Sequence, residues 1–550
     1  MENVELVLLD TKSIQQYIFS CNKLRLNLGA SYIVSHIYRE DLLAAVAEAT
    51  GETLTDVSML DEWKQNPATV RMFTEDVPFE VGYIGGGNAF LMFRPGLGST
   101  FVERWTLRLL KEYPGLSTGV ACMTVPVTSL QTNSFKQTLF EAFKLLAHNK
   151  SGQYPVTTPA KYGITMDCAL DADSCETWHA GDTLDMFVSA AAEAKIQASL
   201  RVREDLQQRY GDILDGREFP SELDHLGQRE GDSHVAIVQI DGNSMGKLLM
   251  GCTSLEQQRT FSVELARANE ESFRHALAEL VAVMPALEAT EEFVFTDESR
   301  PDCPRYVPLR PLVGEGDDRT FATDARIALF FTESYMRYFS SCLVLGKPIS
   351  CSAGIAIVKT AYPFYRAYRL AEQLCEAAKD ARRQWQDSLD NPPDTSWLDF
   401  YLAYGGLSGD LSSIRERQYI VDGMRLHDGP YCLDPQVPGA GWPLLDDLIK
   451  GIRYFSPAAD KWPHSKVKEL RAALSSGKES TGVFLDEMRA RGLGLPSTSA
   501  GTDPWVERAT TTPPTSTPYF DMVELVELYP PALLDKRAEV RGAAAMGGKS

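Results

Sequence analysis

The alternation of apolar and polar residues predicts strands and helices in a pattern that occurs twice along the chain. An apolar, strand-like run ends at Asp10 within LLDTKSIQQYI, and a second such run ends at Asp241 within QIDGNSMGKLL. In each copy a serine follows the aspartate by three residues, and a helical pattern begins there. The two aspartates lie 231 positions apart, which indicates an internal repeat.

Further landmarks repeat at nearly the same spacing. Each copy continues with two apolar runs around a glycine corner, which read VGYIGGGNAFLMF in the first copy and RPLVGEGDDRTF in the second. Gly87 and Asp317 correspond at a separation of 230 positions, and helices that end at Lys150 and Lys379 correspond at 229. Because these separations agree within two residues, we interpret the chain as a tandem duplication.

Each copy reads as strand, helix, strand, strand, helix, strand and a trailing helix. This order predicts an α+β fold of two ferredoxin-like βαββαβ domains, each with an antiparallel sheet covered by helices on one face. The predicted division is a first domain at 1–165, a helical linker region at 166–231, a second domain at 232–391, a helical C-terminal domain at 392–495, and a Ser/Thr/Pro linker, docking strand and disordered tail at 496–550. The docking strand is assigned to YFDMVELVELYPP, because its apolar and polar residues alternate.

The second glycine corner, GEGDD, is expected to place two carboxylates beside a third. Strands one and three are neighbours in this fold, so Asp241 should lie next to Asp317 and Asp318. A hairpin turn alone would explain the corner, since Gly-Asp and Asp-Gly pairs are common in turns. Three carboxylates, however, suit Mg²⁺ or Mn²⁺, which prefer oxygen ligands and serve in phosphoryl transfer. We therefore assign catalysis and metal binding to these three acids.

Other residues are assigned to nucleotide binding. Glycines allow the backbone to approach a ligand closely, and two cations four apart on the trailing helix can meet phosphates. The alternative for the cations is a solvated helix end, and the alternative for the first glycine corner is a tight hairpin. A lone Asp10 is a poor magnesium site, so the first copy is expected to hold an acceptor nucleotide without metal. The predicted nucleotide-binding residues are Gly242, Gly314, Gly316, Lys379, Arg383, Gly85, Gly86, Gly87 and Asn88.

The composition limits the classes of molecule that the protein is expected to bind. With 75 acidic and 54 basic side chains the net charge is −21, which disfavours non-specific nucleic-acid binding. The start MENVELVLLD has no basic segment typical of a signal peptide, and no apolar run is long enough to predict a membrane span. Ten cysteines without a CxxC pair indicate free thiols in a reducing compartment. We expect a cytoplasmic protein that handles small nucleotides.

The two aspartate-ending strands, the GGDD-like corner and the stretch SCSAGIAIVKTAYPFYRAYRLAEQLCEAAKDAR resemble the tandem palm domains of the large polymerase/cyclase subunit of type III CRISPR complexes. They resemble GGDEF nucleotide cyclases more distantly. The resemblance covers roughly residues 1–165 and 232–390. It implies that one palm binds metal and joins ATP molecules into cyclic oligoadenylates, while the other palm, without the acids, holds the acceptor nucleotide.

The chain also departs from this family. Glu315 stands where the family has a glycine, and its carboxylate would crowd a triphosphate. The pair His427-Asp428 lies in a Gly/Pro turn without the other ligands of an HD nuclease, so a stand-alone relative without that domain is expected. The sequence thus predicts a metal-dependent nucleotidyltransferase that turns ATP or another NTP into a cyclic oligo- or dinucleotide, and the resemblance implies a signal for anti-phage defence. The alternative is an inactive palm protein that binds nucleotide or a protein partner as a sensor or scaffold, alone or as a homo-oligomer.

Overall fold

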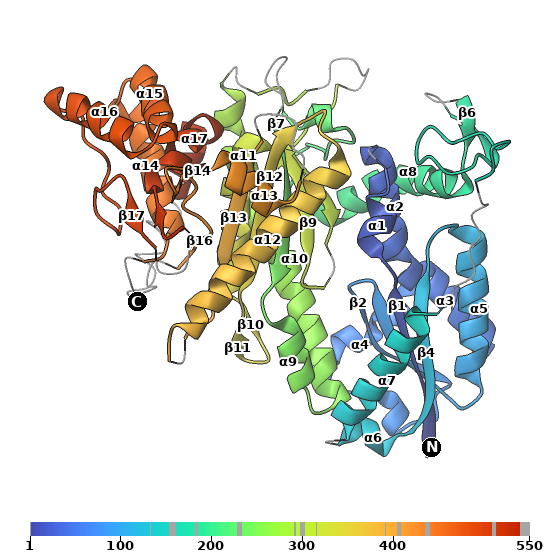
Figure 1. Cartoon of the computed structure of the whole chain (residues 1–550). Helices are drawn as coiled ribbons and strands as arrows, with labels where there is room; N and C mark the ends of the chain where they lie inside the picture. The colour runs from blue at the N-terminus through green and yellow to red at the C-terminus, as the bar shows by residue number, and fades with distance from the viewer. Residues whose placement is uncertain are drawn as a thin grey trace.

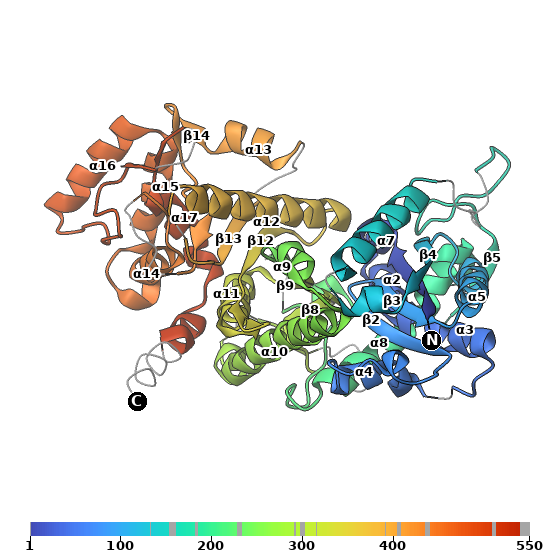
Figure 2. The same cartoon turned by 90° about the horizontal axis from the view of Figure 1, so that it is seen from below.

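The computed structural model contains three parts that follow one another along the molecule. It describes residues 2–538 except 22, 55, 133, 153–160, 182–184, 228–233, 291–292, 297–302, 315, 391, 404–408, 435–440 and 509–512. The first palm and the C-terminal part lie on opposite sides of the second palm in both cartoon views (Figure 1, Figure 2). The predicted disordered end at 539–550 lies outside the described residues.

The first palm has the predicted ferredoxin-like topology. Its main elements are β1 (Asn3–Thr11), α1 (Ile14–Ile18), α2 (Leu24–His36), α3 (Leu42–Thr50), β2 (Phe79–Gly85), β3 (Asn88–Phe93), α5 (Leu97–Glu112), β4 (Thr118–Pro126) and α7 (Phe135–Lys150). Short helical turns are α4 (Glu62–Gln65) and α6 (Thr128–Gln131). The strands form an antiparallel sheet in the order β2-β3-β1-β4. This order puts the first and third strands side by side, as the repeat pattern predicts.

The second palm repeats that topology and extends it. Its elements are β7 (His234–Gly242), α9 (Met245–Gly251), α10 (Leu255–Glu288), β8 (Leu309–Val313), β9 (Arg319–Asp324), α11 (Ala325–Ser341), the hairpin β10 (Leu343–Val344) and β11 (Lys347–Pro348), β12 (Cys351–Lys359) and α12 (Phe364–Asp387). The order β12-β7-β9-β8 in its sheet matches that of the first palm. The α+β class and the duplication are therefore confirmed.

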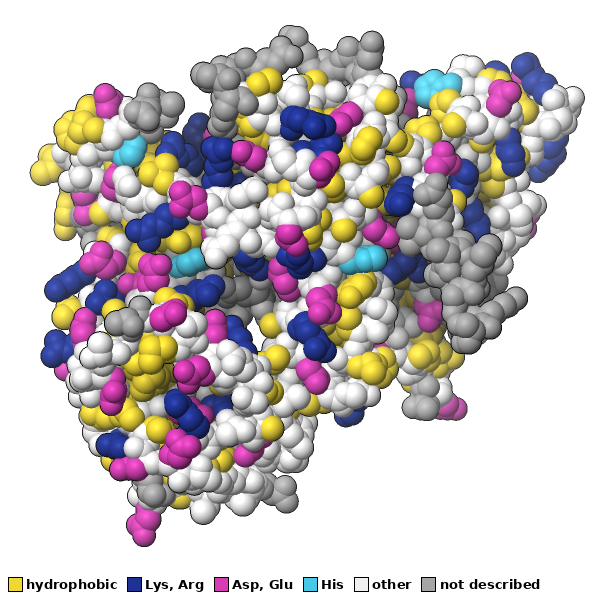
Figure 3. Space-filling view, turned by 180° about the vertical axis from the view of Figure 1, so that it is seen from behind, with side chains coloured by type: hydrophobic (Ala, Val, Ile, Leu, Met, Phe, Trp, Pro, Cys, Tyr) yellow, Lys and Arg dark blue, Asp and Glu magenta, His cyan; other side chains and the backbone are white. Residues whose placement is uncertain are grey.

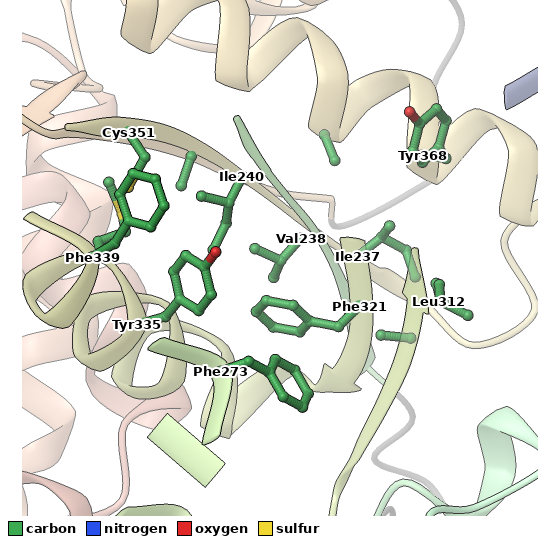
Figure 4. Close-up of a cluster of buried hydrophobic side chains, with 14 of the residues drawn as sticks. Ile237, Val238, Ile240, Phe273, Leu312, Phe321, Tyr335, Phe339, Cys351 and Tyr368 are labelled. Carbon is green, nitrogen blue, oxygen red and sulfur yellow. The ribbon is translucent and has the colours of Figure 1, made fainter. Parts of the chain in front are cut away.

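Alternation along the strands explains the layering of the second palm. Val238 and Ile240 of β7 face α10 and α11, where they meet Phe273, Phe321 and Tyr335 in a buried cluster (Figure 4). Successive strand residues point to opposite faces, so the residues between them point the other way. On that opposite face α12 covers part of the sheet, and the remainder is left for the first palm.

The region between the palms contains a short hairpin as well as the predicted helical segment. It contains a hairpin of β5 (Thr177–Ala180) and β6 (Asp185–Val188), followed by the predicted long helix, α8 (Ala190–Tyr210). Helix α8 packs on α2, and Gly29 permits this because a Cβ there would collide with the Lys195 carbonyl. The linker is therefore a packed element between the palms.

The C-terminal part adds a strand to the sheet of the second palm and corrects one prediction. Its elements are β13 (Trp397–Leu402), α13 (Leu411–Gln418), β14 (Ile420–Val421), β15 (Met424–Arg425), β16 (Tyr431–Cys432), α14 (Leu445–Phe455), α15 (His464–Ser475), α16 (Lys478–Ala490), β17 (Val506–Glu507), β18 (Thr515–Ser516) and α17 (Pro518–Leu525). Strand β13, which follows the predicted domain boundary at 391, pairs in parallel with β12 and so extends the palm sheet. The predicted docking strand is the helix α17, whose residues are all buried, so burial on every side conceals the helical period.

Two further features concern the surface and the predicted partners. Among the described residues, none of the helices combines the length and apolar character needed to cross a bilayer. On the face shown in Figure 3, Lys and Arg side chains are interspersed with Asp and Glu side chains. Such mixing offers acidic nucleic acid little attraction on that face.

Candidate nucleotide and metal site

The two predicted glycine corners meet between the palms. In the first palm Gly85 pairs with Asn88, and the turn residues Gly86 and Gly87 have φ of 63° and 73°, a region that favours glycine. In the second palm Gly316 has φ of 69°, and a Cβ placed on it would lie 3.4 Å from the Gly86 Cα. The corners are thus in backbone contact, which agrees with the expectation that the palms face each other.

The three predicted carboxylates lie together at the second corner. Asp241 stands near the end of β7, where Ile240 pairs with Arg319 at the start of β9. This ladder brings Asp241 to the turn that carries Asp317 and Asp318. Gly242 is needed for this approach, because a Cβ on it would lie 2.9 Å from the Asp317 Cβ.

Electrostatic repulsion dominates this cluster. Burial, together with the neighbouring Asp241 carboxylate, raises the pKa of Asp317 to about 6. The same causes, with the Asp317 charge added, raise the pKa of Asp318 well above its ordinary value. The Lys379 ammonium opposes both shifts only in part. The cluster therefore carries more negative charge than its protein surroundings neutralise.

One ion pair occurs in both palms. The Lys379 Nζ donates to the Asp241 carboxylate, and in the first palm the Lys150 Nζ donates to the Asp10 carboxylate. The strand-ending aspartates share another feature, since Ser13 and Ser244 three residues later both have left-handed φ, 53° and 60°. The lysines that mark the repeat in sequence thus contact the aspartates that mark it.

Residues that the sequence did not single out hold the second corner. Asn269 of α10 donates from Nδ2 to the carbonyls of Gly316 and Asp318 at 3.0 and 3.2 Å. Its Oδ1 accepts from the Arg319 Nε at 2.9 Å. Gly314 leaves room for the Arg319 guanidinium, which a Cβ would strike. A single asparagine in a helix of 34 residues gives no signal in the sequence.

A cavity of about 910 Å³ lies between the palms and reaches both corners. Its volume is at the upper end of the range for small-molecule sites. Helices α2, α8, α10 and α12 are among the elements that contribute to its wall. Among the lining residues are Asp10, Gly85, Gly86, Gly87, Asn88, Gly314, Gly316, Asp317 and Asp318. Arg209 of α8 also lines it.

The first corner lacks both carboxylates of the second, because Gly87 corresponds to Asp317 and Asn88 to Asp318. Asn88 pairs with Asp10 across β1 and β3, at the position that Asp318 takes in the second palm. The Asn88 Oδ1 is buried and accepts no hydrogen bond from the described residues. The first corner thus offers an amide and a lysine-paired carboxylate, which is a weaker cation site than the second.

One predicted residue, Arg383, is not brought to the site. Arg383 is exposed and forms ion pairs with Glu376 and Asp380 of its own helix, away from the corner. Arg382 lies on the buried face of α12 instead, and its Nη2 donates to the Ser244 Oγ at 3.3 Å. Glu315, whose carboxylate was expected to crowd a phosphate, lies outside the described residues.

The negative charge of the three clustered carboxylates suits a divalent cation. Two carboxylates with raised pKa beside a third are the chemistry that Mg²⁺ or Mn²⁺ would stabilise. Among the described residues, no three His, Cys, Asp or Glu side chains stand in an arrangement that could hold a metal ion as they are. Lys379 engages Asp241 in this structure, so a metal would have to displace the Lys379 ammonium.

Comparison with known proteins agrees with this geometry. Residues 234–388 match the family model of Cas10/Cmr2, second palm domain. The chain resembles the Cas10/Cmr2 proteins. The matched segment begins at β7 and ends with α12, so it contains Asp241, the GEGDD corner and Lys379. No curated protein matched in sequence.

Solved structures extend the Cas10 resemblance beyond the second palm. The fold is similar to a chain of the Csm1–Csm4 cassette in complex with pppApA, with a TM-score of 0.51 and 12% identity over 96% of this chain and 69% of that one. The cassette in complex with one ATP gives a TM-score of 0.50 and 12% identity, over 96% and 70%. Csm1 in T.onnurineus gives 0.45 and 13%, over 97% and 70%. At these identities the first two matches support the shared fold alone.

Proposed function

We propose that the protein is a metal-dependent nucleotidyltransferase that converts ATP, or another NTP, into a cyclic oligo- or dinucleotide. The observation that carries this proposal is the single cavity that joins the carboxylate corner of one palm to the glycine corner of the other. Two nucleotides in such a cavity would place the hydroxyl of one near the phosphates of the other. The Csm1–Csm4 cassettes in complex with pppApA and with ATP support the same class of ligand.

Each residue has a role in this proposal. Asp241, Asp317 and Asp318 would hold Mg²⁺ or Mn²⁺, which neutralises phosphate charge and lowers the pKa of the attacking hydroxyl. Lys379, released from Asp241, would turn to the phosphates as a point charge. The glycine corner and Asn88 of the first palm would hold the acceptor nucleotide. The 2′- or 3′-oxygen bonds to the α-phosphorus of the donor, pyrophosphate leaves, and the hydroxyl proton passes to solvent.

The biological setting follows from the product. A cyclic nucleotide made by a Cas10-like palm pair would act as a signal in anti-phage defence and would be read by an effector protein. The mixed charge on the surface in Figure 3 is consistent with a small-molecule substrate.

The test is incubation of the protein with each NTP and Mg²⁺ or Mn²⁺, followed by mass spectrometry of the products. We expect a cyclic product and pyrophosphate, and a loss of at least about 100-fold in rate for Asp317→Ala, which removes a metal ligand. Asp486→Ala, an exposed aspartate on α16, is the matched control and should keep full activity. Product formation by Asp317→Ala at the wild-type rate would refute the metal assignment.

The second candidate is a nucleotide-binding sensor or scaffold without turnover. The ion pair between Lys379 and Asp241 favours it, because that carboxylate is already neutralised. Nucleotide binding without pyrophosphate release under every metal and NTP tested would support this alternative.

A further inference from the structure

Gln258 is a buried side chain in the cavity wall whose polar atoms have no partner in the described part of the chain. It lies in the first turn of α10 and has an exposed fraction of 0%. Among the described residues, neither its Oε1 nor its Nε2 finds a hydrogen-bond partner. It nevertheless lines the cavity between the palms. An amide that is fully buried with both ends unsatisfied requires an explanation in a folded protein.

The buried Gln258 amide lowers the stability of the free protein. Leaving a buried amide without hydrogen bonds costs about 1–3 kcal/mol for each unsatisfied group, whereas an apolar side chain of the same shape would cost nothing. The neighbouring cavity residues of α10 show that an apolar side chain would suit the wall, since Phe261 and Leu265 lie on the same face. A glutamine at this position is therefore explained best by a polar ligand.

The helix places Gln258 at the far end of the cavity from the carboxylates. The cavity-lining residues of α10 form one stripe along the helix: Gln258, Phe261, Ser262, Leu265 and Ala266. Asn269 continues the stripe and holds the carboxylate corner through Gly316 and Asp318. Eleven residues of α-helix separate Gln258 from Asn269, a rise of roughly 16 Å. A nucleotide with its phosphates at the corner would extend its base along this stripe.

The neighbour of Gln258 fixes its position. Arg259 is fully buried and binds the first palm, with its Nε donating to the Gly82 carbonyl at 3.0 Å and its Nη1 to the Thr69 carbonyl at 2.7 Å. It also forms an ion pair with Glu80 at 2.9 Å. These contacts hold the start of α10 against β2, so the turn of helix that carries Gln258 is a rigid part of the cavity wall.

We propose that Gln258 is a specificity-determining residue that reads an adenine base. Its Oε1 would accept from the adenine N6 amino group, and its Nε2 would donate to the adjacent ring nitrogen, the two-bond pairing that glutamine forms with adenine. The surrounding apolar residues Phe261 and Leu265 would pack on the base. This inference rests on the proposed function, because it takes a nucleotide as the ligand.

The test measures nucleotide binding rather than turnover. Affinities for ATP, GTP, CTP and UTP are measured calorimetrically with wild type, Gln258→Met and Gln258→Glu. Gln258→Met keeps the shape and removes the amide, so ATP affinity should fall about 10- to 100-fold while the affinities for other NTPs change little. The thermal midpoint of the free variant should equal or exceed that of wild type, because the unsatisfied amide is gone. Gln197→Met, an exposed glutamine of α8, is the matched control.

The outcomes separate this inference from the proposed function. ATP affinity of Gln258→Met within twofold of wild type would overturn the inference, and so would an equal loss for all four NTPs or a wild-type preference for another base. Selective loss of ATP binding without any product from wild type would support Gln258 and refute the enzyme. Product formation by wild type with unchanged binding by the variant would do the reverse. No NTP binding by wild type would refute both.

Discussion

At the scale of single residues, the first palm lacks both carboxylates that the second palm carries at its glycine corner, because Gly87 and Asn88 stand in place of Asp317 and Asp318. Asn88 in the first palm occupies the position of Asp318 in the second, opposite the strand-ending aspartate. An amide carries no charge, and the Asp10 carboxylate is paired with Lys150. In the second palm the extra carboxylates leave negative charge that a cation can stabilise. The asymmetry between the palms is therefore electrostatic, while their backbones share one topology.

The raised pKa of Asp317 predicts a pH-dependent stability in the absence of metal. Folding raises this pKa from its ordinary value near 3.9 to about 6, so the protonated form is favoured in the folded state. That stability is fully present below about pH 4 and is lost as pH rises through 6, with a total of about 3 kcal/mol. Asp317→Asn should therefore gain stability relative to wild type between pH 4 and pH 7, measured by urea unfolding.

The stability measurement is repeated with added metal and with a control variant at an exposed aspartate. Addition of Mg²⁺ or Mn²⁺ above pH 6 should restore the stability of wild type and leave Asp317→Asn unchanged. Asp486→Asn, an exposed aspartate on α16, should follow wild type at every pH. A constant difference between wild type and Asp317→Asn across this pH range would contradict the assigned electrostatics.

At the scale of elements, the contact between the two glycine corners determines whether the cavity is composite. Gly86 and Gly316 have left-handed φ, and their backbones approach to the distance of direct contact. Side chains at these positions would separate the hairpins, and with them the carboxylates from the acceptor pocket. The glycines therefore serve both turn geometry and the assembly of one site from two hairpins.

A leucine at Gly86 should impair product formation beyond its effect on stability. Gly86→Leu and Gly96→Leu introduce a side chain at φ of 63° and 90°, so each should cost about 1–2 kcal/mol in unfolding free energy. Gly96 begins α5 with open space around it, whereas Gly86 faces Gly316. Only Gly86→Leu should lower the rate of product formation, by at least about tenfold. Equal rates for the two variants would show that the corners do not cooperate.

At the scale of the whole molecule, Arg537, close to the last described residue, connects the C-terminal part to the second palm through ion pairs. Arg537 forms ion pairs with Glu333 at 2.7 Å and with Asp446 at 3.0 Å. Glu333 lies on α11, a helix that covers the palm sheet, and its side chain is only 4% exposed. Arg337 of the same helix joins the cluster by pairing with both acids. These charges connect the C-terminal part to the layer beneath the site.

Removal of Arg537 should destabilise the molecule far more than removal of an exposed arginine. Arg537→Met leaves the buried Glu333 carboxylate with one cation fewer, which should cost about 3 kcal/mol in unfolding free energy. Arg491→Met removes an exposed pair with Glu487 and should cost less than about 1 kcal/mol. Urea unfolding of both variants checks the difference. Similar values would indicate that the Arg537 pair is solvated and contributes little.

The local pattern of the sequence was sufficient for the repeat and for the composition of the second corner. Asp10, Asp241, Lys150 and Lys379 were identified by spacing alone, and the structure brings each lysine to its aspartate. This was possible because a βαββαβ unit places residues by short-range periodicity and by a fixed strand order. The prediction of a docking strand relied on the same short-range periodicity and was wrong. Helix α17 is buried on all sides, so its sequence displays no helical period.

Long-range packing determined the features of the site that the sequence did not predict. The sequence could not show that Gln258 has a buried amide without partners, that Asn269 holds the corner, or that Arg383 lies in solvent. Each of these depends on which faces of α10 and α12 meet the cavity, and that is set by how the two palms dock. The sequence by itself thus determined the duplicated fold and the acids. Only the tertiary structure determined the shared cavity, because contacts between the palms join residues more than 200 positions apart.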